Sequence, residues 1–214
     1  MTAPNRAREN QRKRTRAALL AAAAALMRDG GRPSVADVAA AADVARRTAY
    51  RYFPSSEQLH TEAALETIRP LMDAVLAATG DDPEVRLDHT VREMHRLAVQ
   101  NEDLLRAMIR LTIDQRTRRT VPANVPVRGS RRVDWLEAAL KPVRARLAPR
   151  AFARLISALT FCVGPEALIA LRDIRGLDDK NAADVSSWAA VALLRASLSE
   201  AGAKRSKPRP AHKR

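Results

Sequence analysis

Cysteine is almost absent from this sequence. Cys162 is the only one in 214 residues, so no intramolecular disulfide can form, which fits a reducing compartment. Its neighbours Phe161 and Val163 are apolar and predict a buried thiol rather than a nucleophile. Glycine is also scarce, with 7 residues, and no segment alternates apolar and polar residues in the way that is typical of a strand. Alanine, leucine and arginine dominate instead, and these good helix formers predict an all-α protein.

Long apolar runs are absent as well, since no stretch approaches the roughly 20 apolar residues that a membrane-spanning helix needs. Residues 1–27 still imitate a secretory signal, because six basic residues precede the weakly apolar ALLAAAAALM. We favour a first helix at 14–28 that ends at Gly30 and packs against the segment after it. The packing residues of this helix are expected to be Leu19, Ala23 and Leu26. We therefore expect a cytoplasmic protein with no membrane partner.

Signatures of catalysis are missing too. The sequence contains no GxGxxG, no P-loop and no GxSxG motif, which argues against an enzyme. His89 and His95 are six positions apart and do not match the i, i+4 spacing of a helical metal pair, and no cysteine or carboxylate cluster completes a site. We expect no catalytic residue, no metal and no cofactor.

The few aromatic residues are unevenly distributed. The chain has two tryptophans, two tyrosines and three phenylalanines, yet Tyr50, Tyr52 and Phe53 fall within four positions of one another. They belong to residues 34–59, SVADVAAAADVARRTAYRYFPSSEQL, which contain the signals of a helix-turn-helix. A generic apolar core would not concentrate its aromatic residues in this way.

Capping and turn residues divide this segment into two helices. Ser34 and Asp37 form a capping-box pattern that opens a short helix, which extends to about residue 41. Asp43 follows at a turn, where a residue that tolerates a positive φ is needed. The second helix is predicted at about 45–52, and its N-terminal turn is the part that enters the major groove in helix-turn-helix docking.

The side chains of the second helix suit DNA. Arginine bonds bidentately to the O6/N7 edge of guanine, and threonine offers a hydroxyl and a methyl group to thymine. We expect base contacts from Arg46, Arg47 and Thr48. An alternative interpretation is a helical hairpin whose aromatic residues only fill a core. Tyr50 and Tyr52 argue against it, because they flank Arg51 and cannot both face inward together with Phe53.

The segment TAYRYFPSSEQL, preceded by SVADVAAAADV, resembles the DNA-binding domain of the tetracycline-repressor (TetR) family of bacterial transcriptional regulators. The resemblance covers about residues 14–59 and implies the same base contacts. The expected phosphate contacts are Ser34, Tyr50, Tyr52, Ser55 and Ser56. The sequence departs from the family pattern at Asp43, where glycine is common, at Ala45, where serine is frequent, and at Ser56, where a phosphate-binding lysine is common. Ser55, which forms a second capping-box pattern with Gln58, and Ser56 are expected to replace that lysine with hydroxyls and a helix N-terminus.

The rest of the chain has the pattern of a helical bundle. A helix is predicted at 57–79 with a kink at Pro70, because its apolar residues recur at helical spacing and Gly80 follows. Further helices are predicted at 84–99, 102–118, 131–147, 149–175 and 179–202, with kinks at Pro142 and Pro165. A loop that holds Pro122, Pro126 and Gly129 divides this set.

The resemblance implies that these helices bind a ligand and form a homodimer. Methionines and aromatic residues adapt to irregular apolar ligands, although each is individually more often a plain core residue. The candidate pocket residues are Met72, Met94, Met108, Thr112, Trp135, Phe152 and Phe161. The candidate dimer-interface residues are Leu168, Leu171, Val185, Trp188, Ala192 and Ala196. The last helix face has an alternative, which is that it packs only inside its own chain.

The formal net charge of +14 is concentrated at the two ends. Residues 1–16 and 204–214 each hold six basic residues, against one acidic residue in the first segment and none in the second. We expect a basic disordered arm at 1–13, a DNA-binding domain at 14–56, a helical ligand-binding and dimerisation domain at 57–203, and a basic disordered tail at 204–214. The arm adjoins the DNA-binding domain and can reach phosphates or a minor groove, whereas the tail is either a solubilising segment or a non-specific attractor of DNA.

The sequence therefore predicts a homodimeric transcriptional regulator that binds double-stranded DNA. The more specific hypothesis is a repressor that a small apolar or cationic effector releases from a palindromic operator. A basic architectural protein that coats DNA without ligand control is the alternative, because both ends of the chain are strongly basic.

Overall fold

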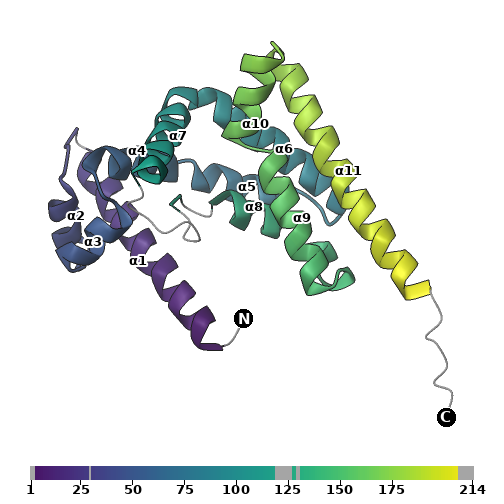
Figure 1. The fold of residues 1–214 in the computed structure, drawn as a ribbon, viewed down its shortest axis with the longest axis horizontal. Coiled ribbons are helices and arrows are strands. Elements are labelled where there is room, and N and C mark those ends of the chain that lie inside the picture. Colours follow the sequence, from purple (N-terminus) through teal and green to yellow (C-terminus); the bar gives the residue numbers. More distant parts are fainter. Residues whose placement is uncertain (1–2, 29, 119–126, 129–130, 207–214) are drawn as a thin grey trace. The chain divides into compact units, whose positions relative to one another are not determined.

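The structure, a computed structural model, describes residues 3–28, 30–118, 127–128 and 131–206 (Figure 1). Every regular element in these ranges is helical, which confirms the all-α expectation. The chain divides into two units. Unit 1 comprises Met1–Arg69 and Asp103–Val127, and unit 2 comprises Pro70–Glu102 and Arg128–Arg214.

Unit 1 contains the four N-terminal helices and most of α7. Their bounds are α1 (Ala3–Met27), α2 (Val35–Ala41), α3 (Arg46–Tyr52), α4 (Ser56–Glu66) and α7 (Glu102–Thr117). Helix α1 packs against α2 and α4, and α2 packs against α3. Apolar side chains of the first four helices share one core, in which Leu19, Phe53 and Leu59 are among the largest fully buried residues.

Helix α1 is longer than the sequence predicts. It begins at Ala3, so the disordered arm expected at 1–13 is wrong for residues 3–13, whose backbone is helical. The reason is composition: apart from Pro4 near the start, this stretch holds mostly arginine, alanine, glutamate and glutamine, and a helix extends through such residues once a packed segment has nucleated it. The expected C-terminal stop is present, because Gly30 has a φ of 79°. Leu26, however, is 42% exposed and does not pack in the core as expected.

The boundary between the two units differs from the one expected at 56/57. Helix α4 contributes Leu59 and Ala63 to the core of unit 1, so it belongs to that unit together with α1. Residues 103–127 also return to unit 1, so each unit is built from two separate stretches of chain. Such a return depends on contacts between segments that are far apart in the sequence.

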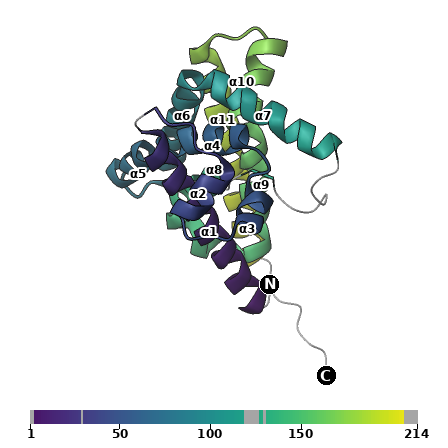
Figure 2. The same ribbon diagram turned by 90° about the vertical axis from the view of Figure 1, so that its left-hand side faces the viewer.

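Unit 2 is a bundle around the long C-terminal helix. Its elements are α5 (Arg69–Ala78), α6 (Pro83–Gln100), α8 (Arg131–Ala139), the 3₁₀ helix η1 (Lys141–Arg146), α9 (Pro149–Cys162), α10 (Pro165–Ile169), the π-helical segment η2 (Ala170–Ile174) and α11 (Asp179–Ser206). Helix α11 packs along α6 and α9, and α8 packs against the same two helices (Figures 1 and 2). Because α11 extends to Ser206, the first part of the tail expected at 204–214 is helical, and residues 207–214 lie outside the described residues.

The expected kink at Pro165 is a break between two helices. The single helix predicted at 149–175 is interrupted before Gly164, whose φ of 99° no helix can contain. Proline lacks an N–H and is tolerated only in the first turn of a helix, so Pro165 begins α10. A Cβ at Gly164 would lie 2.7 Å from Cζ of Arg132, which shows how closely this side chain approaches the break. The Arg132 Nη1 group donates to the Thr160 carbonyl (2.7 Å) and so caps the end of α9.

Two other predicted helices are also divided. The stretch 57–79 forms α4 and α5, with a turn at residues 67–68 ahead of Pro70. The stretch 131–147 forms α8 and η1, and Pro142 lies in the first turn of η1. In both cases the proline lies near the start of the second helix, which is the position that its missing N–H permits.

No single helix in the described part of the chain is long and apolar enough to cross a membrane. One bent pair, α9 with the segment Pro165–Ile174, passes by length and composition alone, at an angle of 41°.

Candidate nucleic-acid interface

The first helix of the helix-turn-helix begins with the predicted capping box. The Ser34 hydroxyl accepts from the amide of Asp37 (3.2 Å), and the Asp37 carboxylate accepts from the amide of Ser34 (2.8 Å). The carboxylate also accepts from the Ser34 hydroxyl (2.7 Å), and these hydrogen bonds lower the pKa of Asp37 below its ordinary value. The turn that follows contains Asp43 with a φ of 51°, as predicted. The amide of Val44 then donates to the carbonyl of Ala39 (2.9 Å), which closes the turn.

Helix α3 has a buried face and an outward face. Ala49 and Phe53 are both fully buried and fix the helix on the core of unit 1. The two predicted base-reading arginines, Arg46 and Arg47, are exposed on the first turn, and Thr48 is partly exposed beside them. The three side chains expected to read bases are therefore available on one turn of a helix whose opposite face is anchored.

The two tyrosines of α3 differ in exposure. Tyr50 is 43% exposed, whereas Tyr52 is partly buried and packs against the core of unit 1. The guanidinium of Arg51 lies 5.8 Å from the centroid of the Tyr52 ring. Tyr50 therefore has the freer hydroxyl of the two for a phosphate.

The start of α4 carries half of the predicted second capping box. The Ser55 hydroxyl accepts from the amide of Gln58 (3.2 Å), but the Gln58 side chain does not return to the N-cap. Instead its Nε2 donates to the Glu62 carboxylate (3.1 Å), and its Oε1 accepts from Nε2 of Gln115 in α7. Gln58 is buried, so this side chain is a core residue rather than a cap. Ser55 and Ser56 both remain partly exposed.

A buried carboxylate behind the recognition helix was not found by sequence reasoning. Glu62 is 1% exposed and forms an ion pair with Arg16 of α1. The Arg16 guanidinium lies 5.0 Å from the centroid of the Phe53 ring, which follows the end of α3. The signal for this cluster is spacing, because Glu62 lies three residues after Leu59 and falls on the same core-facing side of α4. A charge at such a position needs a partner.

Comparison with known proteins identifies this domain. Residues 19–63 match the family model of bacterial regulatory proteins of the tetR family. This DNA-binding domain belongs to the tetR family. Comparisons with curated proteins and with solved structures gave no match. The matched range runs from the packed half of α1 to Ala63 of α4, so the chain is a DNA-binding transcriptional regulator whose tetR domain contains the outward arginines of α3.

The predicted pocket residues are divided between the two units. Three of them are buried in unit 2, namely Met72, Met94 and Phe152, and Trp135 is partly buried in the same unit. Met108 and Thr112 lie on α7 and belong to unit 1. Phe161 is 86% exposed, so its expected place in an interior pocket is wrong. It is the penultimate residue of α9, on a face that no described segment of unit 2 covers. The partly buried thiol of the neighbouring Cys162 has a pKa raised by burial, which does not suit a nucleophile.

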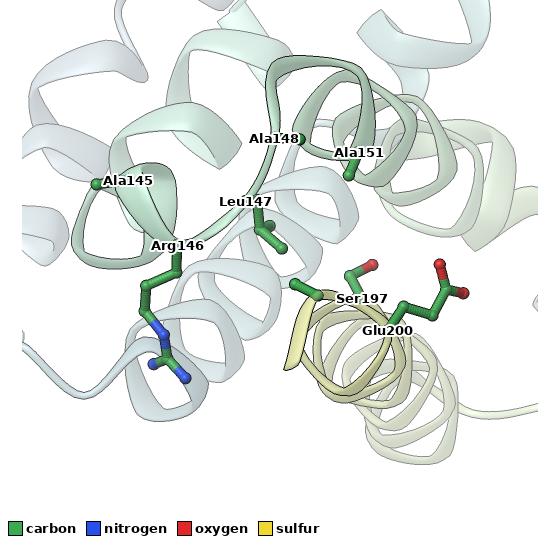
Figure 3. A pocket seen from close by; sticks show the side chains of 8 residues that line it. Ala145, Arg146, Leu147, Ala148, Ala151, Ser197 and Glu200 are labelled. Carbon is green, nitrogen blue, oxygen red and sulfur yellow. The ribbon is translucent and has the colours of Figure 1, made fainter. Parts of the chain in front are cut away.

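A groove does occur elsewhere in unit 2, between η1, the start of α9 and the end of α11 (Figure 3). Its volume is about 310 Å³. The lining residues are Ala145, Arg146, Leu147, Ala148, Ala151, Ser197, Glu200 and Ala201, none of which was a predicted pocket residue. No cluster of three or more histidine, cysteine, aspartate or glutamate residues suited to a metal is found in the described part of the chain.

The predicted dimer-interface residues divide into two groups. Leu168 is 1% exposed inside unit 2, so it cannot present a surface to a partner, and its prediction is wrong. Leu171 is partly buried. The remaining four, which all lie on α11, are exposed: Val185, Trp188, Ala192 and Ala196.

Proposed function

We propose that this regulator is a homodimeric repressor whose two α3 helices read the half-sites of a palindromic operator. The observation that carries the proposal is the outward position of Arg46 and Arg47 on the first turn of α3, above the buried Ala49 and Phe53. Arginines in this position match guanine edges in the major groove, while the buried residues fix the helix on the core of the DNA-binding domain. A single helix-turn-helix offers a small specific footprint, so a second copy is needed for tight operator binding.

Exposed apolar side chains in unit 2 support the homodimer. Trp188 of α11 is 73% exposed and Phe161 of α9 is 86% exposed, although both are large and apolar. Val185, one helical turn before Trp188, is 42% exposed. Helices α9 and α11 pack against each other, so these residues belong to neighbouring elements. Exposed apolar side chains of this size on neighbouring helices are typical of an interaction site, and a second copy of the chain is the partner that two-fold operator reading requires.

Buried polar atoms support a small-molecule effector in unit 2. Trp135 Nε1, His95 Nε2 and Ser186 Oγ are buried and have no hydrogen-bond partner among the described residues. Buried polar groups are normally paired, so each such atom calls for a partner that the described residues do not provide. We infer an apolar or cationic effector that also carries hydrogen-bonding groups and that releases the operator. An effector can shift the DNA-binding equilibrium only by its different affinity for the two states.

Selection of duplexes from random sequence, followed by footprinting, tests the proposal. The expected result is one palindromic site per dimer, with a protected region that does not spread as protein is added. Arg46→Ala or Arg47→Ala should cost about 1–3 kcal/mol of operator binding and relax the preference at one base pair, because a bidentate base contact is lost. Tyr50→Phe should weaken binding to all DNA sequences by a similar factor, since a phosphate contact carries no sequence information. Uniform coating without a preferred site would instead support an architectural protein.

The effector is tested separately. Compounds from a chemically broad library are first selected for raising the melting temperature of the protein, and each hit is then assayed for release of the selected operator. If every stabilising compound leaves operator affinity unchanged, unit 2 is a dimerisation scaffold without ligand control.

A further inference from the structure

Helix α1 extends well beyond the part of it that packs in the core. It has 25 residues, but its buried apolar residues begin only at Leu19. The described side chains from Asn10 to Arg14 are all exposed. In both views the N-terminal half of α1 continues past the other helices of unit 1 as a separate rod (Figures 1 and 2). This half also precedes residue 19, where the tetR family match begins, so the extension is not part of the shared domain.

The core-facing side of α1 becomes basic along this extension. Residues three and four apart share one face of a helix, so Leu19 and Ala23 lie on the same stripe as Arg16 and Arg12. We call the face of the extension that carries the exposed Arg12 the basic stripe. It continues the face with which α1 contacts α2 and α4.

The basic stripe lies close to the recognition helix. Arg16, on the same face, places its guanidinium 5.0 Å from the ring of Phe53, which follows the last residue of α3. Arg12 is one turn further along α1, or about 6 Å at a rise of 1.5 Å per residue. Unlike Arg16, which is paired with Glu62, Arg12 is exposed and forms no ion pair with any described residue. Its charge is therefore available to a ligand outside the chain.

We propose that the basic stripe of α1 binds phosphate groups of the same DNA duplex that α3 reads, outside the helix-turn-helix footprint. The inference rests on the proposed operator binding. A duplex carries a phosphate charge every ~1.7 Å of its axis, so one that continues past α3 offers phosphates on either side of the helix-turn-helix. Charge complementarity therefore favours DNA as the occupant. Because α1 is one helix with the packed segment, the extension meets the duplex as a preformed rod and pays little ordering entropy.

The test compares two variants of the full chain, Arg12→Gln and Arg14→Gln. Both replaced residues are exposed arginines, and each substitution removes one positive charge per chain. They lie about 200° apart around the helix, so Arg14 is on the opposite side from the basic stripe. Operator affinity is measured for the wild-type protein and both variants between about 50 and about 200 mM salt.

Log affinity falls as log salt rises, and this fall should be steeper for the wild-type protein than for Arg12→Gln by about 1.8 in slope. The reason is that a dimer carries two copies of the residue and each phosphate contact contributes about 0.9. Across that salt range this corresponds to a roughly 12-fold difference in how much affinity each protein loses. Arg14→Gln should keep the wild-type slope, and all three proteins should select the same operator.

Each other outcome overturns one hypothesis and spares the other. If both variants keep the wild-type slope, the extension does not touch the duplex, although the operator proposal stands. If both reduce the slope equally, the effect is one of net charge and the basic stripe has no special role. If the wild-type protein selects no operator at all, the proposed function fails before the variants are compared.

Discussion

At the scale of the residue, the buried carboxylate of Glu62 is the most demanding feature of unit 1. A carboxylate that is only 1% exposed is stable only while it is paired, and the partners of Glu62 include Arg16 and Gln58. We predict that Arg16→Leu lowers the free energy of unfolding of unit 1 by about 3–5 kcal/mol, because it removes the guanidinium that is paired with the buried Glu62 carboxylate. Arg14→Leu, at an exposed position of the same helix, should cost less than about 0.5 kcal/mol. Denaturant unfolding measures both values.

The double variant Arg16→Leu/Glu62→Leu separates loss of the charge pair from loss of packing. With the carboxylate also removed, most of the stability should return, since apolar replacements of a buried ion pair are often neutral. Equal stability of Arg16→Leu and Arg14→Leu would show that the ion pair contributes nothing.

His95 makes the stability of unit 2 depend on pH. Burial lowers the pKa of this imidazole below its ordinary value of 6.5, with Asp179 opposing the shift and Arg172 adding to it. The folded chain therefore stays neutral at His95 while the unfolded chain takes up a proton below about 6.5, so the free energy of unfolding should fall as the pH drops through that value. Unfolding at about pH 7.5 and about pH 5.5 measures the difference. His95→Gln should reduce it, whereas replacement of the exposed His89 by asparagine should not.

The residues whose roles could be predicted from the sequence are those that interact only with close neighbours in the chain. Ser34 with Asp37, and Asp43 at the turn, depend only on neighbours within a few positions, and both were predicted correctly. Phe161 and Leu168 were misplaced because the pattern identifies an apolar face but not what covers it. Both lie at helical spacing in apolar surroundings, yet one is exposed and the other is buried. The packing of α9 and α10 against their neighbouring helices decides between these outcomes.

At the scale of the element, one arginine ties the ends of two helices together. The guanidinium of Arg86 donates to the Thr79 and Gly80 carbonyls after α5 (2.7 and 3.1 Å) and to the Ala139 carbonyl of α8 (3.1 Å). Helix C-termini leave carbonyls without partners, and a planar guanidinium with five donors can serve several of them at once. The C-termini of α5 and α8 therefore depend on a side chain from α6.

We predict that Arg86→Met destabilises unit 2 by about 2–4 kcal/mol, because several carbonyls, most of them partly buried, lose a charged donor together. Arg86→Lys should recover only part of the lost stability, since an ammonium group cannot donate to the same set of carbonyls as a planar guanidinium. Arg96→Met is the matched control on α6, because its partner is the neighbouring Glu93 at the surface, and it should cost less than about 1 kcal/mol. Thermal unfolding of the three variants checks the order. A loss for Arg96→Met as large as that for Arg86→Met would contradict the role assigned to Arg86.

Helix ends were predicted well where capping signals are strong and poorly where prolines occur. The expected segment 84–99 is observed as Pro83–Gln100, and Asp82 caps its first turn. Around Pro165 the apolar spacing continues across the break, so periodicity alone indicates one helix. The left-handed backbone of Gly164 and the insertion of Arg132 beside it interrupt that helix, and neither has a signal in the local pattern.

At the scale of the whole molecule, the return of α7 to unit 1 was not predictable from local patterns. Helix α7 supplies Gln115, which donates to Gln58, and Arg110, which lies 3.3 Å from the Glu57 carboxylate. These residues are more than fifty positions apart, and nothing in the amphipathic pattern of α7 identifies α4 as its partner. The helical class and the helix-turn-helix were predictable, because they depend on residues that are close in sequence.

The last prediction concerns the proposed dimer. Trp188→Arg should convert the protein to a monomer. A dimer of this variant would bring two guanidinium groups, one from each chain, into the apolar contact that α9 and α11 are proposed to form with the same helices of the partner. Ile174→Arg is the matched control. Ile174 is 80% exposed, as open as Trp188, but it lies at the end of η2 and outside the proposed surface, so this variant should remain a dimer. Both substitutions add one positive charge per chain, so any general effect of charge on association appears equally in each.

Sedimentation velocity at micromolar concentration, with and without the selected operator, distinguishes the two variants. The Trp188→Arg monomer should lose most of its preference for the palindrome over a single half-site, because each helix-turn-helix then binds alone with a small footprint. Its tetR domain should keep the same base preference within that half-site, since Arg46 and Arg47 belong to unit 1 and are unchanged. If Trp188→Arg stays dimeric while Ile174→Arg dissociates, the partner surface lies near η2 instead. A wild-type protein that is monomeric with and without DNA would rule out the homodimer altogether.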